Sequence, residues 1–395
     1  MTGLLILIYL TFVGLGLGDS LLGSAWPAMH AGFGVDAAAA GPLAMLISGS
    51  TIVATYLSTR ILRRFGIGLV LPVGMFLIAA SVLAFSLAGH FVVLLLLAIP
   101  MGFGVGSVDA SGNGFVTIHF SAKHMSWLHC FWGAGATAGP AIMTFSLIHL
   151  SGWVMGYRIV GAIHLAVVLG LLAALRHWKQ IRSLDDKSPK IIEAQPECTP
   201  STSSLLRMRG ARLAILLFFV TGGLEMTLGL WGNTYLVLAR GVAGETAAGW
   251  LALYYLGLTV GRLAFGFLAV RLRSLTMIRI GQGMITAGVL IVALPFAGTL
   301  MPGFILLGLG LAPIFPNYMH NTPVLFGKEH TQAMVGLQII GTHTGIMLLP
   351  PLFGIIGRRF GYSLFPLFVG FLLAVTILLV AILYRDLPKR ESPSS

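Results

Sequence analysis

The chain has 395 residues, of which 57% are hydrophobic and only 9% are charged, and its mean hydropathy is +0.93. Soluble domains carry about 25% charged residues, so this composition excludes a disordered chain, a disulfide scaffold and a cytosolic enzyme. The net charge of +12 could suggest a nucleic-acid partner, unless the basic residues gather at one membrane face. The composition therefore predicts a polytopic membrane protein.

Long uncharged stretches predict twelve transmembrane helices, because each span needs about 20 apolar residues. Helices are expected because the apolar runs lack the alternation that is typical of a membrane barrel. In chain order, the predicted spans are Leu4–Met29, Ala37–Ser58, Ile67–Ala88, Phe91–Ile118, Met125–Leu150, Trp153–Leu175, Leu213–Ala239, Thr246–Leu268, Met277–Ala297, Pro302–Thr322, Thr331–Ile356 and Tyr362–Tyr384.

Lysine and arginine lie mostly on one side of these spans. Nineteen fall in the loops and tails on the side of the N-terminus, and four fall in the opposite loops. The positive-inside rule therefore predicts a multi-pass protein of the plasma (inner) membrane with both termini in the cytoplasm. The basic surplus then faces the lipid headgroups, and no nucleic-acid partner is expected.

A polar segment interrupts the apolar spans in the middle of the chain. Residues 177–211 are rich in Ser, Pro, Lys and Arg, as expected of a disordered cytoplasmic linker. This linker separates an N-terminal six-helix bundle at 1–176 from a C-terminal six-helix bundle at 212–384, and a cytoplasmic tail follows at 385–395. The predicted fold is an all-α membrane protein of two pseudo-symmetric six-helix bundles, in a monomer.

The two predicted halves also share sequence features. Gly104 and Asn113 in the fourth span recur 204 residues later as Gly308 and Asn317. Internal duplication is typical of secondary transporters, which bind their solute at the repeat interface near the middle of the membrane.

Four charged residues lie inside the predicted spans: Asp19, Asp109, Glu225 and Arg262. An ionised side chain at a helix centre costs about 2.5–3.5 kcal/mol on insertion scales, so each needs a reason to be there. Burial disfavours the charged form of a carboxyl group, which lets it exchange a proton near neutral pH. The three acids are therefore candidates for proton or cation coupling. Alternatively, they only hold helices together, either protonated or paired with Arg262.

The arginines at or near the inner ends of the spans are candidates for gating or structural roles. Arg262 could clamp an anionic substrate, but its position low in its span favours bracing of helix ends near an inner gate. Arg63, Arg64 and Arg271 follow the second span of each half and belong to the same group.

Amide, imidazole and aromatic side chains in the spans could bind a neutral polar solute. The alternative roles are an interfacial aromatic belt and interhelical hydrogen bonds. Asn113 with Asn317 and His129 with Gln338 are the preferred candidates, because each pair lies at related depths in the two halves. The full set of substrate-binding candidates is Asn113, His129, Trp132, Trp231, Asn233, Tyr254, Asn317, Gln338 and His343.

The sequence gives no support to cofactor, metal or enzyme chemistry. The eleven histidines form no H-x-x-x-H or Cys/His ligand spacing, so no metal site is expected. A dinucleotide loop, a nucleophile elbow and a zincin motif are also missing. No cofactor is expected, and the expected partners are a small-molecule substrate, a coupling proton or sodium ion, and the lipid bilayer.

Five motifs lie along the spans of this chain. They are Gly104-Val-Gly-Ser-Val-Asp109-Ala-Ser-Gly-Asn113, Leu128-His129-Cys-Phe-Trp-Gly133-Ala-Gly135, Glu225 with Trp231 and Tyr235, Gly310-Leu-Ala-Pro313-Ile-Phe-Pro316 and Leu349-Pro350-Pro351-Leu-Phe-Gly354. They resemble motifs of the major facilitator superfamily, and more narrowly of its fucose-permease branch with the sodium-dependent glucose transporter-like members. The resemblance covers nearly all of the chain and implies alternating-access transport, with the acid at Asp109 serving proton coupling. The loop after the second span lacks the acidic residue that is usual in the superfamily.

The sequence thus predicts a secondary transporter, with proton-coupled symport of a small polar solute such as a sugar as the preferred function. A proton-coupled antiporter that exports drugs or metabolites is the alternative, because Gly135 to Pro140 also resembles the fifth-helix motif of exporters. A membrane receptor without transport is a third class, disfavoured because no sizeable soluble domain is attached.

Overall fold

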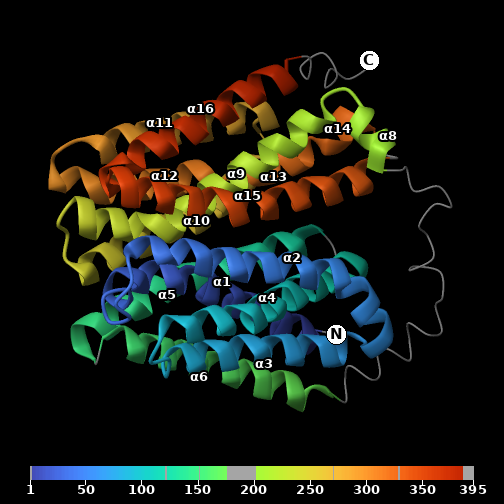
Figure 1. The fold of residues 1–395 in the computed structure, drawn as a ribbon. Coiled ribbons are helices and arrows are strands. Elements are labelled where there is room, and N and C mark those ends of the chain that lie inside the picture. The colour runs from blue at the N-terminus through green and yellow to red at the C-terminus, as the bar shows by residue number, and fades with distance from the viewer. Residues whose placement is uncertain are drawn as a thin grey trace.

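The computed structural model describes residues 2–120, 122–150, 152–175, 202–269, 271–327 and 330–385, and all of their regular structure is helical (Figure 1). Within these ranges, twelve segments are long and apolar enough to cross a membrane. The predicted all-α membrane fold is therefore confirmed.

Six long helices form the first half of the described chain. They are α1 (Thr2–Met29), α2 (Ala40–Phe65) after the short 3-10 helix η1 (Ala37–Ala39), α3 (Ile67–Phe85), α4 (Phe91–His119), α5 (Ala122–His149) and α6 (Trp153–Ala173).

The second half contains more helices, because two of its spans are built from several pieces. After α8 (Thr202–Arg207), they are α9 (Ala211–Thr234) with the π-helical η2 (Tyr235–Ala239), α10 (Gly244–Leu268), α11 (Ser274–Ala293), η3 (Ala297–Thr299) with α12 (Leu300–Leu311), α13 (Ile314–His320) and α14 (Thr322–Phe326), α15 (Thr331–Phe360), η5 (Tyr362–Leu364) and α16 (Phe365–Leu383).

The predicted span limits agree with the structure to within a few residues at most ends. The tenth span shows the largest difference, because it extends over Ala297–Phe326 instead of Pro302–Thr322. Its helix is interrupted at Pro313, which has no backbone N–H to donate and so ends α12. Residues 177–201 of the predicted linker and 386–395 of the predicted tail lie outside the described residues.

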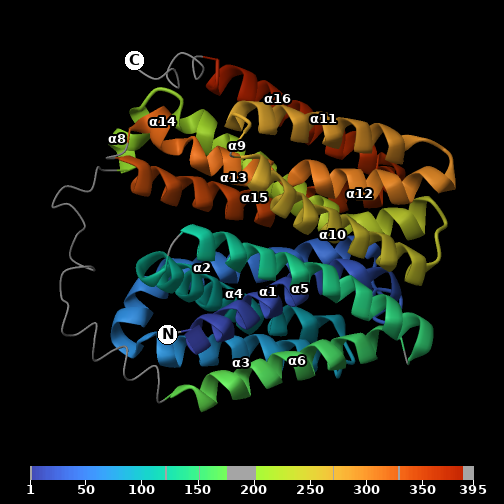
Figure 2. The same ribbon diagram turned by 180° about the vertical axis from the view of Figure 1, so that it is seen from behind.

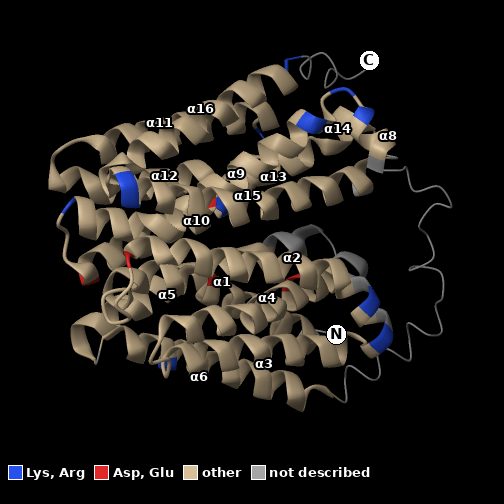
Figure 3. Ribbon diagram, in the orientation of Figure 1, with Lys and Arg blue, Asp and Glu red and all other residues tan. Residues whose placement is uncertain are grey.

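Helices α1–α6 pack into one bundle and α9–α16 into a second, which lies beside the first (Figures 1 and 2). The start of α1 and the end of α16 lie at the same end of the molecule, called here the terminal end; the opposite end is called the far end. Basic residues lie at this end on the last part of α2 and around α8 (Figure 3). The exposed arginines of these segments are Arg60, Arg64, Arg207 and Arg209.

Within each half, the first helix packs closely against the fifth long helix. In the first half, Gly135 of α5 lies against the carbonyl group of Val13 in α1. In the second half, Gly345 of α15 lies in the same way against the carbonyl group of Phe219 in α9. A side chain at either glycine would overlap this backbone. The two contacts therefore identify Val13 and Phe219 as equivalent positions of the two halves.

Glycine contacts of the fourth and tenth spans likewise show which residues of these two spans are equivalent; this correspondence between the halves is called here the repeat register. Gly104 of α4 lies against the carbonyl group of Gly74 in α3, and Gly310 of α12 lies against that of Gly281 in α11. Gly104 is thus equivalent to Gly310, and the sequence-based pairing of Gly104 with Gly308 is wrong by two residues. Two residues turn a helix by about 200°, so the paired residues face different neighbours.

The two halves meet through α1 with α9, α2 with α15, and α5 with α10. Gly23 lies against the carbonyl group of Gly229, and Asn233 Nδ2 donates to the carbonyl oxygen of Ser24 at 2.5 Å. Among the described residues, the glycines that closely approach the opposite half all lie from mid-span to the far end. Further contacts toward this end join Gly41 with Pro351, Gly354 with Ala38, and Thr144 with Glu245.

Candidate functional site

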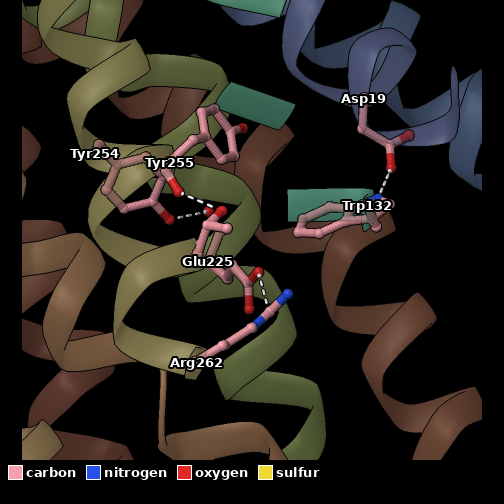
Figure 4. Close-up of polar contacts among 7 residues, drawn as sticks. Asp19, Trp132, Glu225, Tyr254, Tyr255 and Arg262 are labelled. Atoms are coloured by element: carbon pink, nitrogen blue, oxygen red, sulfur yellow. Dashed lines mark hydrogen bonds and ion pairs between the residues drawn. The ribbon is translucent and has the colours of Figure 1, made fainter. Parts of the chain in front are cut away.

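Four polar side chains, called here the interface cluster, form a connected row between the halves (Figure 4). Trp132 Nε1 on α5 donates a hydrogen bond to Asp19 Oδ2 on α1 at 2.9 Å. Arg262 Cζ on α10 lies 5.2 Å from the ring centroid of Trp132, within the range of a cation–π contact. Arg262 Nη2 also lies 3.4 Å from Glu225 Oε1 on α9. The cluster therefore joins two helices of each half.

The interface cluster contains two carboxyl groups and one arginine. The side chains of Arg262 and Glu225 are 16% and 23% exposed, so water screens their attraction less than at a surface. Their single long contact is weaker than a bidentate pair, and Arg262 Nε is buried without a hydrogen-bond partner. Asp19 has the neutral indole of Trp132 as its hydrogen-bond donor. One carboxyl group thus has no matching cation in the cluster.

Two tyrosines of α10 surround Glu225. The hydroxyl group of Tyr254 donates to the backbone carbonyl of Glu225 at 3.4 Å, and the ring of Tyr254 is fully buried. Tyr255 packs edge-on against Tyr254 with ring centroids 4.9 Å apart, and its hydroxyl group lies beside Gly229. The pair therefore positions the backbone of α9 around Glu225.

Asp109 lies on α4 and is half-buried. Asn113, one turn along the helix, donates through Nδ2 to Asp109 Oδ1 at 2.9 Å and to its backbone carbonyl at 3.0 Å. Asp109 is close enough to Asp19 to interact with it electrostatically. The structure thus brings the predicted coupling acids into one region, with Asp109 outside the contacts that bridge the two halves.

His129 lies one turn before Gly133 on α5, on the terminal side of the interface cluster. Its side chain is exposed, while it lies within electrostatic reach of Arg262 in the other half. Gly133 itself lies against Thr259 of α10. Solvent therefore reaches the interface at His129, but the halves are in contact at Gly133.

His343, another predicted substrate-binding residue, lies on α15 and is half-buried.

Two of the predicted substrate-binding residues lie in closed contacts toward the far end. Trp231 is fully buried and its indole Nε1 donates to the carbonyl oxygen of Pro350 at 2.7 Å. Asn233 is bonded to Ser24 across the interface. The Asn233 bond joins the two halves at the far end, while the Trp231 bond joins α9 to α15 within the second half. Both side chains are buried in this conformation, so a solute does not reach them.

The structure also places Asn317 and Gln338 away from the interface cluster, inside the second half. Asn317 Nδ2 donates to the carbonyl oxygen of Pro313 at 2.6 Å, and Gln338 Oε1 accepts from Thr322 at 3.0 Å. Their exposed fractions are 7% and 1%. In this conformation both side chains are therefore buried within the second half and do not face the first half. The reason is the repeat register, in which Gln338 is equivalent to the fully buried Leu128 and not to His129.

The remaining arginine candidates lie at the terminal end. Arg64 is exposed, with its guanidinium 5.5 Å from the ring of Phe65, and Arg271 is also exposed. Neither forms an ion pair with a described residue. The side chain of Arg63 lies outside the described residues.

Sequence reasoning missed two contributors to this site. Tyr255 and Thr259 follow one another on the same face of α10, where they meet Gly229 and Gly133. Tyr255, Thr259 and Arg262 are spaced by four and then three residues, which places them on one face of a helix. This spacing is the signal that could have identified the face. No group of three or more potential metal ligands occurs among the described residues.

Comparisons with known proteins agree with this architecture. The family model of the Major Facilitator Superfamily matches residues 8–320 and 243–395. "Bypass of stop codon protein 6" of Saccharomyces cerevisiae is 22% identical over 397 residues, covering 92% of this chain and 79% of that protein.

Solved structures of two transporters have the same fold as this chain, at lower sequence identity. A mutant of the nucleoside transporter NupG aligns with a TM-score of 0.78 and 14% identity, over 97% of this chain and 100% of that one. A mutant of the peptide transporter POT in complex with alafosfalin aligns with a TM-score of 0.73 and 13% identity, over 98% of this chain and 94% of that one. At these identities the likeness establishes the fold.

Proposed function

Since the chain belongs to the Major Facilitator Superfamily, and is thus a membrane transporter and not an enzyme, we propose that it carries a small polar solute, such as a sugar, together with protons. The transport cycle is alternating access, in which 1–176 and 212–384 move as two bundles. The exposed arginines at the terminal end support a cytoplasmic position for that end and for both termini, in the plasma (inner) membrane.

The equivalence of Asp19 and Glu225 is the observation that carries this proposal. Asp19 follows Val13 by six residues, and Glu225 follows Phe219 by six residues, so both halves have a carboxyl group at the same place on their first helix. Arg262 offsets one of these charges. Binding of one proton offsets the other, and a mobile charge of this kind is what ion-coupled transport requires.

Asp109 is the third acid of the proposed coupling system. Its hydrogen bond from Asn113 stabilises the ionised form, while its position in a half-buried glycine-rich helix disfavours charge. These opposing effects suit a group that takes up and releases a proton within one cycle. The resemblance of residues 104–113 to the fourth helix of fucose permeases supports the same role.

The chemistry beside the interface cluster favours a neutral solute. His129 and Asn113 offer neutral hydrogen-bonding groups that are not fully buried, and Asp19 can accept a bond from a hydroxyl group. An anionic solute would have to displace Glu225 from Arg262 and would meet two further carboxyl groups nearby. Sugars match the neutral donors and acceptors without that cost.

The closed contacts at the far end and the accessible His129 support a conformation open toward the terminal end. In the proposed cycle, the contacts at Gly23 and Gly229 open while the terminal end closes. Glycines at these contacts let backbones separate and meet again without side chains to rearrange.

A ligand-induced thermal shift tests the proposed solute class. Purified protein is heated with neutral monosaccharides, organic anions or lipophilic cations, and the melting temperature is compared with that of the free protein. The proposal expects stabilisation by at least one neutral monosaccharide, which His129→Ala weakens. Stabilisation by organic anions alone would contradict it.

The alternative function, a proton-coupled antiporter that exports drugs or metabolites, rests on the apolar residues near His129. Trp127 and Phe131 are 46% and 37% exposed on the same helix and could contact a lipophilic solute. Stabilisation by lipophilic cations, together with proton-driven efflux from vesicles, would favour this function over sugar symport.

A further inference from the structure

Trp132 makes two different contacts with the two halves of the molecule. Its indole N–H donates to Asp19 Oδ2 within its own half, and the face of its ring lies 5.2 Å from Arg262 Cζ of the other half (Figure 4). Both contacts involve the same rigid ring system, so a displacement of the indole changes both. We propose that Trp132 is a positioning residue that links the charge on Asp19 to the position of Arg262 across the interface.

The backbone around Trp132 is held from both sides. Its carbonyl group lies against Gly16 of α1, and the next residue, Gly133, lies against Thr259 of α10. The first contact is backbone to backbone, and the second is made by the side chain of Thr259, so the indole starts from a fixed point between the halves. Its contacts with Asp19 and Arg262 are therefore set by the orientation of the ring.

Of the two equivalent helix contacts between the halves, α5 with α10 and α2 with α15, the first contains Trp132 and Arg262 and the second does not. Trp132 precedes Gly135 by three residues, and its equivalent, three residues before Gly345, is Thr342. Arg262 follows Gly261, which meets Ala312 as Ala54 meets Gly106, so the equivalent of Arg262 is Thr55. The contact of α2 with α15 thus has two threonines where the contact of α5 with α10 has the tryptophan and the arginine.

The charge on Asp19 controls the strength of its hydrogen bond with the indole N–H of Trp132. A hydrogen bond to an ionised carboxylate is stronger than one to a neutral acceptor. When Asp19 binds a proton from the solvent, the hold on the indole N–H weakens and the ring can reorient. Arg262 then loses part of its cation–π contact, while it keeps Glu225 as its partner. Neutralisation of Asp19 therefore loosens the contact between α5 and α10.

Other titratable groups also face this part of α1. They are Asp109 on α4, His129 on α5, His164 on α6, Glu225 on α9, and Tyr255 and Arg262 on α10. A change of pH alters several of these groups together, so the test substitutes Asp19 at constant pH.

Cys130 provides a reporter for this contact. It lies beside His129, is half-buried and is within electrostatic reach of Arg262. In the Cys198→Ser protein, the rate at which N-ethylmaleimide labels Cys130 measures how readily the interface opens there. The measurement needs no solute and no ion gradient. The labelling result is therefore independent of the proposed proton coupling: either proposal can be supported while the other is contradicted.

The experiment compares Asp19→Asn in two backgrounds. With Trp132 present, Asp19→Asn should raise the labelling rate about fivefold, as expected when a charged acceptor becomes neutral and the contact between α5 and α10 loosens. In the Trp132→Phe protein, which keeps an aromatic ring but lacks the N–H, Asp19→Asn should leave the rate nearly unchanged. Trp127→Phe, on the same helix, is the matched control and should preserve the full effect of Asp19→Asn.

An equal effect of Asp19→Asn in both backgrounds would overturn the proposal, as would no effect in either. Thermal unfolding of each variant shows whether it is folded. If Trp132→Phe does not fold, Arg262→Lys and Arg262→Gln give the second test. The proposal expects the effect of Asp19→Asn on labelling to persist with lysine and to disappear with glutamine, because only lysine retains a cation at the ring.

Discussion

Asp19 and Glu225 occupy equivalent positions on the first helix of each half, yet only Glu225 has an arginine as its partner. The asymmetry arises because Arg262 on α10 has Thr55 as its counterpart on α2. A duplicated fold thus contains an unequal charge distribution across its interface. One carboxyl group thus has an arginine as its partner, while the other has the neutral indole of Trp132.

Substitution of Asp109 by Asn should separate proton coupling from solute binding. The amide mimics a permanently protonated acid and can still accept the hydrogen bond from Asn113. We expect accumulation driven by a pH gradient to be abolished, while binding and exchange down a solute gradient remain. Transport by purified protein in liposomes measures both. Continued accumulation against a gradient would make Asp109 a structural residue.

Substitution of Gly23 by Ala should impair closure of the far end. A methyl group at Gly23 would overlap the carbonyl group of Gly229, and overpacking of this kind costs roughly 1–3 kcal/mol. We expect a lower melting temperature and slower transport. Gly18→Ala on the same helix is the control, because its methyl group would lie 3.7 Å from Met101 Cε, an ordinary contact. Equal effects of the two substitutions would contradict this account.

His129 and Gln338 should respond oppositely to substitution by alanine. Gln338→Ala removes the buried partner of Thr322 and should lower the free energy of unfolding by about 1–3 kcal/mol, with little effect on solute affinity. His129→Ala should weaken solute binding and leave the melting temperature near that of the wild type, because His129 is exposed. Denaturation and binding measurements on the same preparations distinguish the two. A loss of affinity in Gln338→Ala with normal stability would reverse the assignment.

The ion pair between Arg262 and Glu225 predicts a rescue. Arg262→Gln leaves Glu225 half-buried without its cation and should destabilise the protein by about 1–3 kcal/mol. Adding Glu225→Gln removes that unpaired charge, so the double variant should regain most of the stability. Thermal unfolding of the two single variants and the double variant measures the coupling. Additive losses would show that the pair contributes nothing.

The fold was predictable from the sequence because hydropathy and the spacing of charges act over whole spans. Uncharged runs of about 20 residues predict twelve spans whose ends lie within a few residues of those in the structure, except in the tenth span, which is longer than predicted and is interrupted at Pro313. The sequence also identified Asp19, Asp109, Glu225 and Arg262 as candidates. Charged residues are rare in membrane spans because burying a charge is costly, so they can be recognised in a single sequence.

The detailed site was less predictable, because the face of a helix depends on register. The sequence match of Asn113 with Asn317 is displaced by two residues, and this displacement turns Asn317 into its own bundle. Trp132 was identified as a substrate contact, but its bond to Asp19 joins residues 113 positions apart in sequence. Contacts of this kind arise from tertiary packing, and nothing in the local pattern indicates them.

The most direct test of proton coupling is solute accumulation in liposomes with an imposed pH gradient and no sodium, using the neutral monosaccharide with the largest thermal shift. The account predicts that the wild-type protein accumulates this sugar against its gradient. Asp19→Asn should lose the accumulation but still exchange labelled for unlabelled sugar. Accumulation that follows a sodium gradient and ignores pH would contradict the account, as would full proton-driven accumulation by Asp19→Asn.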